Sequence, residues 1–265
     1  MSTRFFNIAH AITLTFSAYF SYLFFVQFQF SIWVAIPLAI VCATVVGILS
    51  EQILFKQLRR RNAPHMMLMI CSLGLYTVLQ NVILLIWGTG IKRIRPLEVE
   101  AGIVFLRAYV SNSKIVTIIV CLVLFFMCFI FLRFNRIGRS IRAVASNPDL
   151  CNIIGLSSDR TIFFAFGIGS FLVSIAGILI AYDTGIRATM GFSWVLYGAV
   201  AMIIGGIGSH WGLIGGALLL ATAQHLAAYY IGSQWLDATA YIILILFLIA
   251  KPLGFSGKRL KKVEI

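Results

Sequence analysis

The charged residues of this chain are separated by long stretches that carry no charge. No Asp, Glu, Lys or Arg occurs in 5–50, 62–91, 115–132, 161–182 or 188–236. About 20 apolar residues cross the ~30 Å hydrocarbon core of a bilayer as a helix, so the first and last stretches are each long enough for two crossings. The pattern predicts eight spans, near 5–28, 32–54, 66–88, 114–133, 161–182, 193–208, 212–231 and 235–251. The span at 193–208 is short and ends in glycines, so it could instead be a re-entrant half-helix.

Composition agrees with lipid as the solvent for most of the chain. Of its 265 residues, 61% are hydrophobic and 11% are charged, and the mean hydropathy is +1.00. Soluble domains have roughly 25% charged residues. We therefore predict an all-α polytopic integral membrane protein with about eight transmembrane helices, and we treat residues 1–265 as a single transmembrane domain. The five cysteines show no metal-ligand spacing, so we expect neither a metal site nor a disulfide framework.

The placement of Lys and Arg predicts which side of the membrane each loop faces, because cytoplasmic loops are enriched in both. With the N-terminus inside, the inner set is Arg4, Lys56, Arg59, Arg60, Arg61, Arg133, Arg136, Arg139, Arg142, Arg160, Lys251, Lys258, Arg259, Lys261 and Lys262. The outer set is smaller: Lys92, Arg93, Arg95, Arg107, Lys114 and Arg187. This excess favours two cytoplasmic termini in a cell membrane, inner or plasma. The net charge of +13 is then mostly a topology signal beside membrane lipid, and we expect no nucleic-acid partner.

The longest inner loop, 135–160, reads NRIGRSIRAVASNPDLCNIIGLSSDR. A helix is predicted from about Arg139 to Ser146, with Ile141, Val144 and Ala145 on one face by their i, i+3, i+4 spacing. Asn147 ends this helix because Pro148 disfavours helical geometry in the residue before it. Pro148 then starts a second short helix, which Gly155 can end. One interpretation is a basic connector beside anionic lipid. The other is a pair of cytoplasmic surface helices that insert into a partner's groove.

Motifs of enzymes and nucleotide-binding proteins are not found in the sequence. There is no GxxxxGK[ST] phosphate loop, no HExxH and no GxSxG. The GGIG at 205–208 is not a dinucleotide fingerprint, because no strand–turn–helix unit surrounds it. We therefore expect no enzyme activity and no cofactor on this chain, and any energy for transport must come from a partner.

Several segments together resemble one family. GRSIRAVASNPDLCNIIGL is similar to the cytoplasmic coupling loop of permeases in branched-chain amino acid ABC importers. FNIAHAITLTFSAYFSY, MGFSWVLYGAVAMIIGGIGSHWGLIGGALLL and KPLGFSG resemble further family segments in the correct order. The resemblance implies a permease that pairs with a second permease subunit, two cytoplasmic ATP-binding subunits that hold ATP-Mg, and an extracytoplasmic solute-binding protein. It also assigns the ATPase-coupling role to the loop, through Gly138, Arg139, Arg142, Ala143, Asn147, Pro148 and Gly155.

The chain departs from the family pattern at its start. Family members carry one further apolar segment before the stretch that corresponds to Asn7–His10, and this chain begins six residues before Asn7. We therefore predict a shortened chain that lacks the family's first helix, and we expect the face AHAITLTFSA to be without its usual neighbour. In addition, Ala11 stands where the family has Gly, and the family's Pro near Ala188–Thr189 is missing.

Polar and glycine positions inside the predicted spans are candidates for the solute path. Asn7 and His10 lie at i, i+3 on one face of the first span, and intramembrane polar groups are costly enough to suggest function. Gly205 and Gly206 could break a helix and turn free backbone groups toward a cavity. For each of these, simple packing or an interhelical hydrogen bond is the alternative.

Two further groups have structural or surface roles in this interpretation. Gly208, Gly212 and Gly216 recur every four residues, a spacing that lets membrane helices approach closely. Asp183 and Arg187, at i, i+4 near the outer end of the fifth span, are interpreted as an interfacial ion pair, or else as an outer contact for a binding protein or a zwitterionic solute.

The resulting functional prediction is a permease subunit that moves branched-chain amino acids, driven by ATP hydrolysis on partner subunits. One alternative is a related ABC permease for urea, short amides or another small polar solute. The other, from a different class, is a stand-alone secondary transporter or membrane scaffold.

Overall fold

The computed structural model describes residues 7–61, 63–94, 102–105, 108–206, 208–251 and 254–255. Both termini lie outside these ranges, and so do several basic residues on which the orientation was predicted: Arg4, Arg95, Arg107, Lys258, Arg259, Lys261 and Lys262. The chain divides into two compact units, 1–191 and 192–265, which are described separately.

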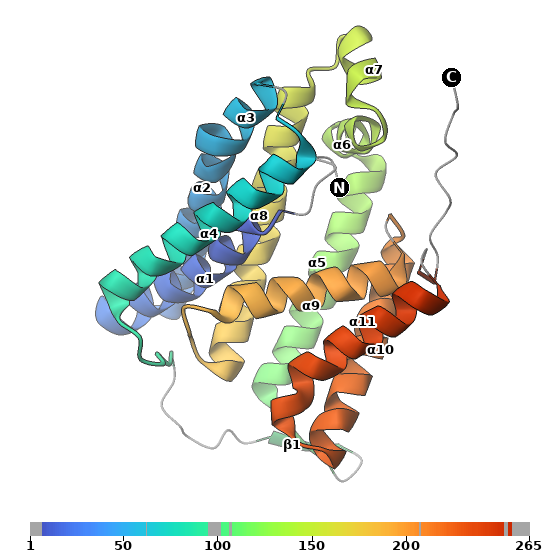
Figure 1. The fold of residues 1–265 in the computed structure, drawn as a ribbon. Coiled ribbons are helices and arrows are strands. Elements are labelled where there is room, and N and C mark those ends of the chain that lie inside the picture. Colours follow the sequence, from blue (N-terminus) through green and yellow to red (C-terminus); the bar gives the residue numbers. More distant parts are fainter. Residues whose placement is uncertain are drawn as a thin grey trace. The chain divides into compact units, whose positions relative to one another are not determined.

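Helices make up nearly all of the described structure (Figure 1). They are α1 (Ala9–Tyr22), α2 (Ile32–Ser50), α3 (Lys56–Arg60), α4 (His65–Trp87), α5 (Asn112–Phe134), α6 (Arg136–Ser146), α7 (Pro148–Ile153), α8 (Ser158–Thr184), α9 (Met190–Gly205), α10 (His210–Tyr230) and α11 (Leu236–Ala250). Two π-helical turns, η1 (Leu23–Gln27) and η2 (Glu51–Phe55), continue α1 and α2, and a 3-10 turn, η3 (Ser233–Trp235), precedes α11. Two short antiparallel strands, β1 (Gly102–Phe105) and β2 (Ala108–Ser111), precede α5.

Seven helical segments of the described chain are long and apolar enough to cross a membrane. They are Ala9–Gln27, Ile32–Arg60, His65–Trp87, Asn112–Phe134, Ser158–Thr184, His210–Tyr230 and Ser233–Ala250. The sixth predicted span, 193–208, corresponds to α9, which has only 16 residues. The predicted class, an all-α polytopic membrane protein, is confirmed, whereas the count of eight crossings is not.

The first unit is built around α1, which contacts α2, α4 and α8 (Figure 1). Small residues allow these contacts. A Cβ on Gly47 of α2 would overlap Ser170 of α8, and a Cβ on Gly177 of α8 would overlap Ser17 of α1. Such close approach is how membrane helices gain packing without a hydrophobic driving force.

Helix α1 is polar for a buried helix. The hydroxyl groups of Thr15, Ser17 and Ser21 donate to carbonyls within the helix, whereas the buried Tyr19 hydroxyl has no partner among the described residues. Thr15 Oγ1 donates to Ala11 O at 3.1 Å, and Ser17 Oγ donates to Leu14 O at 2.8 Å. Apart from half-buried His10, every residue of 9–19 is buried. The stretch AHAITLTFSA is therefore covered by α2, α4 and α8, while the absence of the family's first helix as a further neighbour stays a prediction.

The second unit packs α9, α10 and α11 around Val200, Ile204, Leu220 and Ala240. Gly205 and Gly212 face each other so closely that a Cβ on either would overlap the other's backbone, and Gly216 stands in the same way against Ala201. The predicted close packing at Gly212 and Gly216 is thus observed. Gly208 has a different role, because a Cβ there would meet no described atom within 4 Å and its φ is +91°.

Candidate functional site

The loop 135–160 folds into the two short helices that its sequence indicates, α6 and α7. Asn135 caps α6, since its side-chain Oδ1 accepts from Ile137 N at 3.0 Å. Asn147 ends α6 and caps α7, its Oδ1 accepting from Leu150 N at 3.2 Å. Gly155 follows α7 with a φ of +84°, a conformation that side chains with a Cβ rarely adopt.

Helix α6 is fixed to the rest of the first unit. Gly138 is buried against the end of α5, so that a Cβ there would lie 2.7 Å from Leu132 Cα. Val144 is 0% exposed and belongs to a cluster with Phe55, Leu68 and Phe166. Half-buried Ala143 packs against the same cluster. We call this cluster, which also contains Ala9, Cys151 and Ile162, the anchor cluster.

The direction of the apolar stripe on α6 corrects the docking interpretation. In the docking interpretation of the loop, the face with Ile141, Val144 and Ala145 would insert into a partner. In the structure Val144 is completely buried and the other two are half-buried. The stripe therefore packs against this chain, whereas Arg136, Arg139 and Arg142 are exposed. Arg142 Nη2 donates to Arg133 O at 3.4 Å, back toward α5.

Helix α7 and the residue after it present exposed apolar side chains that the sequence analysis did not single out. Leu150 is 57% exposed, Ile153 79%, and Ile154, which follows the helix, 71%. Cys151 of this short helix is buried in the anchor cluster. Figure 1 shows α3, α6 and α7 at the same end of the unit. The sequence LCNIIG contains these three apolar residues, so it could have indicated the exposed surface. It was overlooked because the apolar pattern of α6 is longer and more regular.

Asn7 and His10 lie beside the anchor cluster. Asn7 Oδ1 accepts from Ala9 N at 3.0 Å, an arrangement that caps the start of α1. Its Nδ2 is buried and donates to no acceptor among the described residues. The His10 ring lies 5.3 Å from the Phe166 ring, measured between centroids. His10 thus lies against α8 and Asn7 caps the start of α1, while the contact of both residues with solute stays a prediction.

Gly205 and Gly206 end α9, as their sequence suggested. Helix α9 stops at Gly205, and Gly206 has a φ of +95°. The backbone groups at this break are nevertheless partly used. Gly206 N donates to Met202 O at 3.0 Å, and Ile204 O accepts from Phe255 N at 2.9 Å. The break is therefore bonded within the second unit, and its place on a solute path stays a prediction.

The predicted ion pair between Asp183 and Arg187 is not formed. Helix α8 ends at Thr184 and Gly185 turns the chain with a φ of +82°, so i, i+4 helical geometry is lost between the two side chains. Both are exposed, and no ion pair joins them in the described structure. Instead, Ile186 and Lys92 exchange backbone hydrogen bonds of 3.0 and 2.8 Å. Each exposed charge stays a predicted outer contact.

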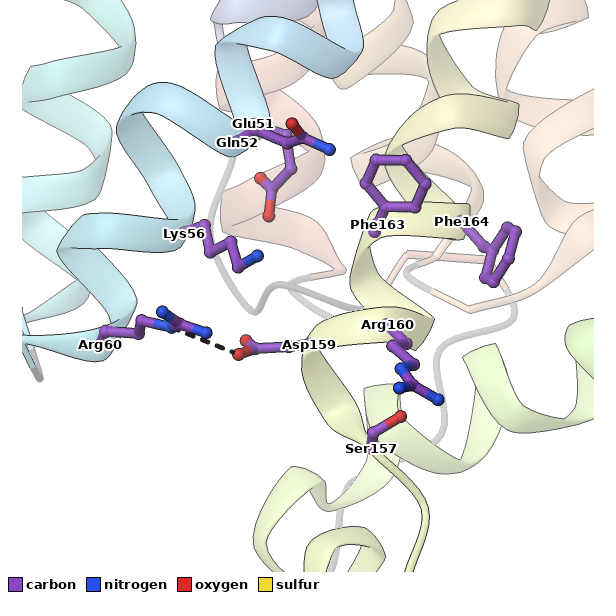
Figure 2. Close-up of a pocket in the computed structure, with 9 residues that line it drawn as sticks. All are labelled: Glu51, Gln52, Lys56, Arg60, Ser157, Asp159, Arg160, Phe163 and Phe164. Atoms are coloured by element: carbon purple, nitrogen blue, oxygen red, sulfur yellow. Dashed lines mark ion pairs between the residues drawn. The ribbon is translucent and has the colours of Figure 1, made fainter.

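A charged cluster at the α3 end was missed by the sequence analysis. Glu51 is 1% exposed, and its Oε1 accepts from Arg59 Nη2 at 2.6 Å. Arg59 Nη2 also lies 3.6 Å from Asp159 Oδ1, and Arg60 Nε lies 3.8 Å from Asp159 Oδ2. Figure 2 shows Arg60 reaching across to Asp159 at the start of α8. These contacts join the α2–α3 segment to α8 beside the anchor cluster.

Comparison with known proteins identifies the class. Residues 1–250 match the family model described as "Branched-chain amino acid transport system / permease component". The chain therefore belongs to this permease family of ABC transporters.

Among relatives, the chain is 29% identical over 225 residues to the high-affinity branched-chain amino acid transport system permease protein LivH of Salmonella typhimurium, covering 83% of this chain and 72% of that protein. It is 29% identical over 230 residues to BraD of Pseudomonas aeruginosa, a permease protein with the same description, covering 84% and 74%. A probable LivH of Methanocaldococcus jannaschii is 24% identical over 246 residues, covering 88% and 76%. No solved structure matches the chain.

Proposed function

We propose that this chain is the transmembrane permease subunit of an ABC importer for branched-chain amino acids, driven by ATP hydrolysis on partner subunits. The family match and its relatives support this proposal. The observation that carries the mechanism is the contrast between fixed α6 and exposed α7. A mechanical coupling element needs one surface that meets the moving partner and another that is bound to the transmembrane helices.

The contacts of α6 suggest where a movement of the loop would go. Gly138 joins α6 to the end of α5, and Val144 joins it to Ile162 and Phe166 of α8. Phe166 in turn contacts His10 of α1. A displacement of α7 would therefore reach α1 through direct packing contacts. In this mechanism the spans alternate between outward and inward access as the partner ATPases close and open.

The partner set belongs to the same proposal. A second permease subunit, two cytoplasmic ATP-binding subunits that carry ATP-Mg, and an extracytoplasmic solute-binding protein complete the importer, and this chain needs no cofactor of its own. The end with α3, α6 and α7 faces the cytoplasm because it gathers the inner basic residues. With α9 as an eighth crossing, this topology places both termini on that side.

The docking role is tested by placing charge on α7. In I153D/I154D the exposed apolar side chains at the end of α7 and directly after it become carboxylates, which cannot enter an apolar groove without a large desolvation cost. We expect ATPase co-purification and leucine uptake to be lost while the amount and melting temperature of the permease stay unchanged. The control is Q57D, which adds a carboxylate at an exposed position of α3 at the same end.

Two outcomes would contradict the proposal in different ways. Normal co-purification and uptake in I153D/I154D would remove α7 from the ATPase interface. Leucine uptake that persists without any ATPase would instead indicate a secondary transporter. Uptake of urea or acetamide in place of leucine, with the same ATPase requirement, would change only the solute.

A further inference from the structure

An open pocket of about 470 Å³ lies between the α2–α3 segment and the start of α8 (Figure 2). Glu51, Gln52, Lys56 and Arg60 form one wall, and the other is formed by Ser157, Asp159, Arg160, Phe163 and Phe164. The coupling mechanism uses none of the cations in this pocket.

Positive charge exceeds negative charge around the pocket. Lys56, Arg60 and Arg160 line it together with two carboxylates, and Arg59 adds a fourth cation beside them. Glu51 is neutralised by Arg59, and Asp159 is shared between Arg59 and Arg60. No carboxylate of the described residues lies within 4.0 Å of the Lys56 or Arg160 nitrogens. Lys56 still interacts electrostatically with Glu51, but four cations face two carboxylates, so an anion placed in the pocket would meet net positive charge.

The pocket also crosses the boundary between polar and apolar surface. Arg160 lies in the first turn of α8, which begins the apolar segment Ser158–Thr184. Phe163 and Phe164 follow about one helical turn later, roughly 5 Å farther along the helix axis. A ligand that fills both parts needs an anionic group beside the cations and an apolar body beside the two rings. A phospholipid at the membrane surface has this arrangement.

One buried polar atom of the pocket indicates which headgroup the ligand should carry. Glu51 Oε2 is buried at the pocket and accepts no hydrogen bond from the described residues. A hydroxyl group on the ligand could donate to it. A glycerol headgroup therefore fits the wall better than one without a hydroxyl, and the excess of cations favours an anionic lipid over a zwitterionic one.

We propose that this pocket binds the phosphate of an anionic glycerophospholipid, between Lys56 and Arg160, with the lipid chains along Phe163 and Phe164. Basic pockets between membrane helices on the cytoplasmic side are suited to such headgroups. The bound lipid would bridge the α2–α3 segment and α8 next to the coupling helices. This proposal does not depend on which solute the permease carries.

The test uses the full-length chain in mild detergent, titrated with short-chain phosphatidylglycerol, phosphatidylethanolamine or phosphatidylcholine and followed by native mass spectrometry. We expect phosphatidylglycerol to bind most tightly. In K56Q/R160Q its affinity should fall about 30-fold, from the loss of two cations near the headgroup. K56R/R160K should keep it. The control R136Q/R139Q removes two exposed cations of α6, outside the pocket, and should leave affinity unchanged.

Four results would overturn the proposal. Equal binding of phosphatidylglycerol and phosphatidylcholine would show that the cations do not select a headgroup, and so would an equal loss in the control variant. Displacement of phosphatidylglycerol by excess inorganic phosphate would assign the pocket to free phosphate. Unchanged lipid binding in K56Q/R160Q together with lost ATPase co-purification would assign the cations to an acidic segment of the partner.

Discussion

Helices α6 and α7 follow each other directly in the chain, but their apolar residues face different surroundings. On α6, Val144 is completely buried in the anchor cluster, and Gly138 is pressed against α5. At the end of α7, Ile153 and the following Ile154 are among the most exposed apolar side chains of the first unit. The difference shows that the apolar face of an amphipathic surface helix such as α6 can pack against its own chain. The exposed apolar surface is then provided by the shorter helix α7 beside it.

The largest effect should come from breaking the ion pair between Glu51 and Arg59, beside the anchor cluster that holds α6. In R59M, Glu51 keeps its burial but loses the guanidinium that neutralises it. Removing one partner of a buried pair costs about 3–5 kcal/mol, so we expect little folded protein and a strongly lowered melting temperature in detergent. In the double variant R59M/E51L no buried charge is left, and it should recover much of the stability. A normal melting temperature in R59M would show that Glu51 is not held as a buried carboxylate.

Next in size is G138V, which tests the contact between α6 and α5. The added side chain would meet the backbone of Phe131 and Leu132, which cannot move aside as a flexible side chain can. Overpacking of this kind costs about 1–3 kcal/mol, and transport should fall with stability. The matched control is G155N, because Gly155 has open space around it and Asn tolerates its left-handed backbone. Equal stability of G138V and wild type would contradict the attachment of α6.

A smaller effect should separate the two helices most directly. V144A removes two buried methyl groups and should cost about 2 kcal/mol. I153A removes more apolar volume, but from an exposed site, so its stability change should stay within about 0.5 kcal/mol. Transport should show the opposite order if α7 meets a partner. Thermal unfolding and leucine uptake of both variants, measured side by side, check the contrast. Equal destabilisation by V144A and I153A would contradict the contrast between a buried α6 and an exposed α7.

The smallest effect concerns the far end of α8. Asp183 and Arg187 are exposed and make no ion pair with each other. D183N should therefore change the free energy of unfolding by no more than about 0.5 kcal/mol, as ordinary surface substitutions do. Its melting temperature should stay near that of the wild type. If Asp183 touches the binding protein, uptake should fall while stability does not. A clear loss of stability would mean that the carboxylate has a partner within the chain.

Local signals in the sequence predicted the elements well. Uncharged stretches located the spans, and Pro148 and Gly155 delimited α7, because both residues act on the backbone around them. The short strands β1 and β2 were missed, since four residues are too few for a recognisable alternation. The Asp183–Arg187 pair failed because the i, i+4 rule assumes a continuing helix and Gly185 ends it.

Contacts distant in sequence could not be predicted in the same way. Helical spacing showed that α6 has an apolar face, but it does not tell which surface covers that face. Phe55, Leu68 and Phe166 cover it, and they come from three other segments. Similarly, Glu51 and Arg59 are eight residues apart, and Asp159 belongs to a helix much later in the chain. No local pattern joins such residues.

The π-helical turn η2 gives the chain one residue to spare between α2 and α3. Its hydrogen bonds close over five residues, where the α-helix uses four, so it accommodates one residue more than an α-helical turn would. Deleting one residue from 51–55 should therefore let an unbroken α-helix form in which Lys56 and Arg60 still point toward α8. The same deletion within the regular helix α2 has no spare residue to remove, and it would turn everything after it by about 100°. The number of residues at 51–55 can thus fall by one without changing where the basic side chains point, whereas the number at 32–50 cannot.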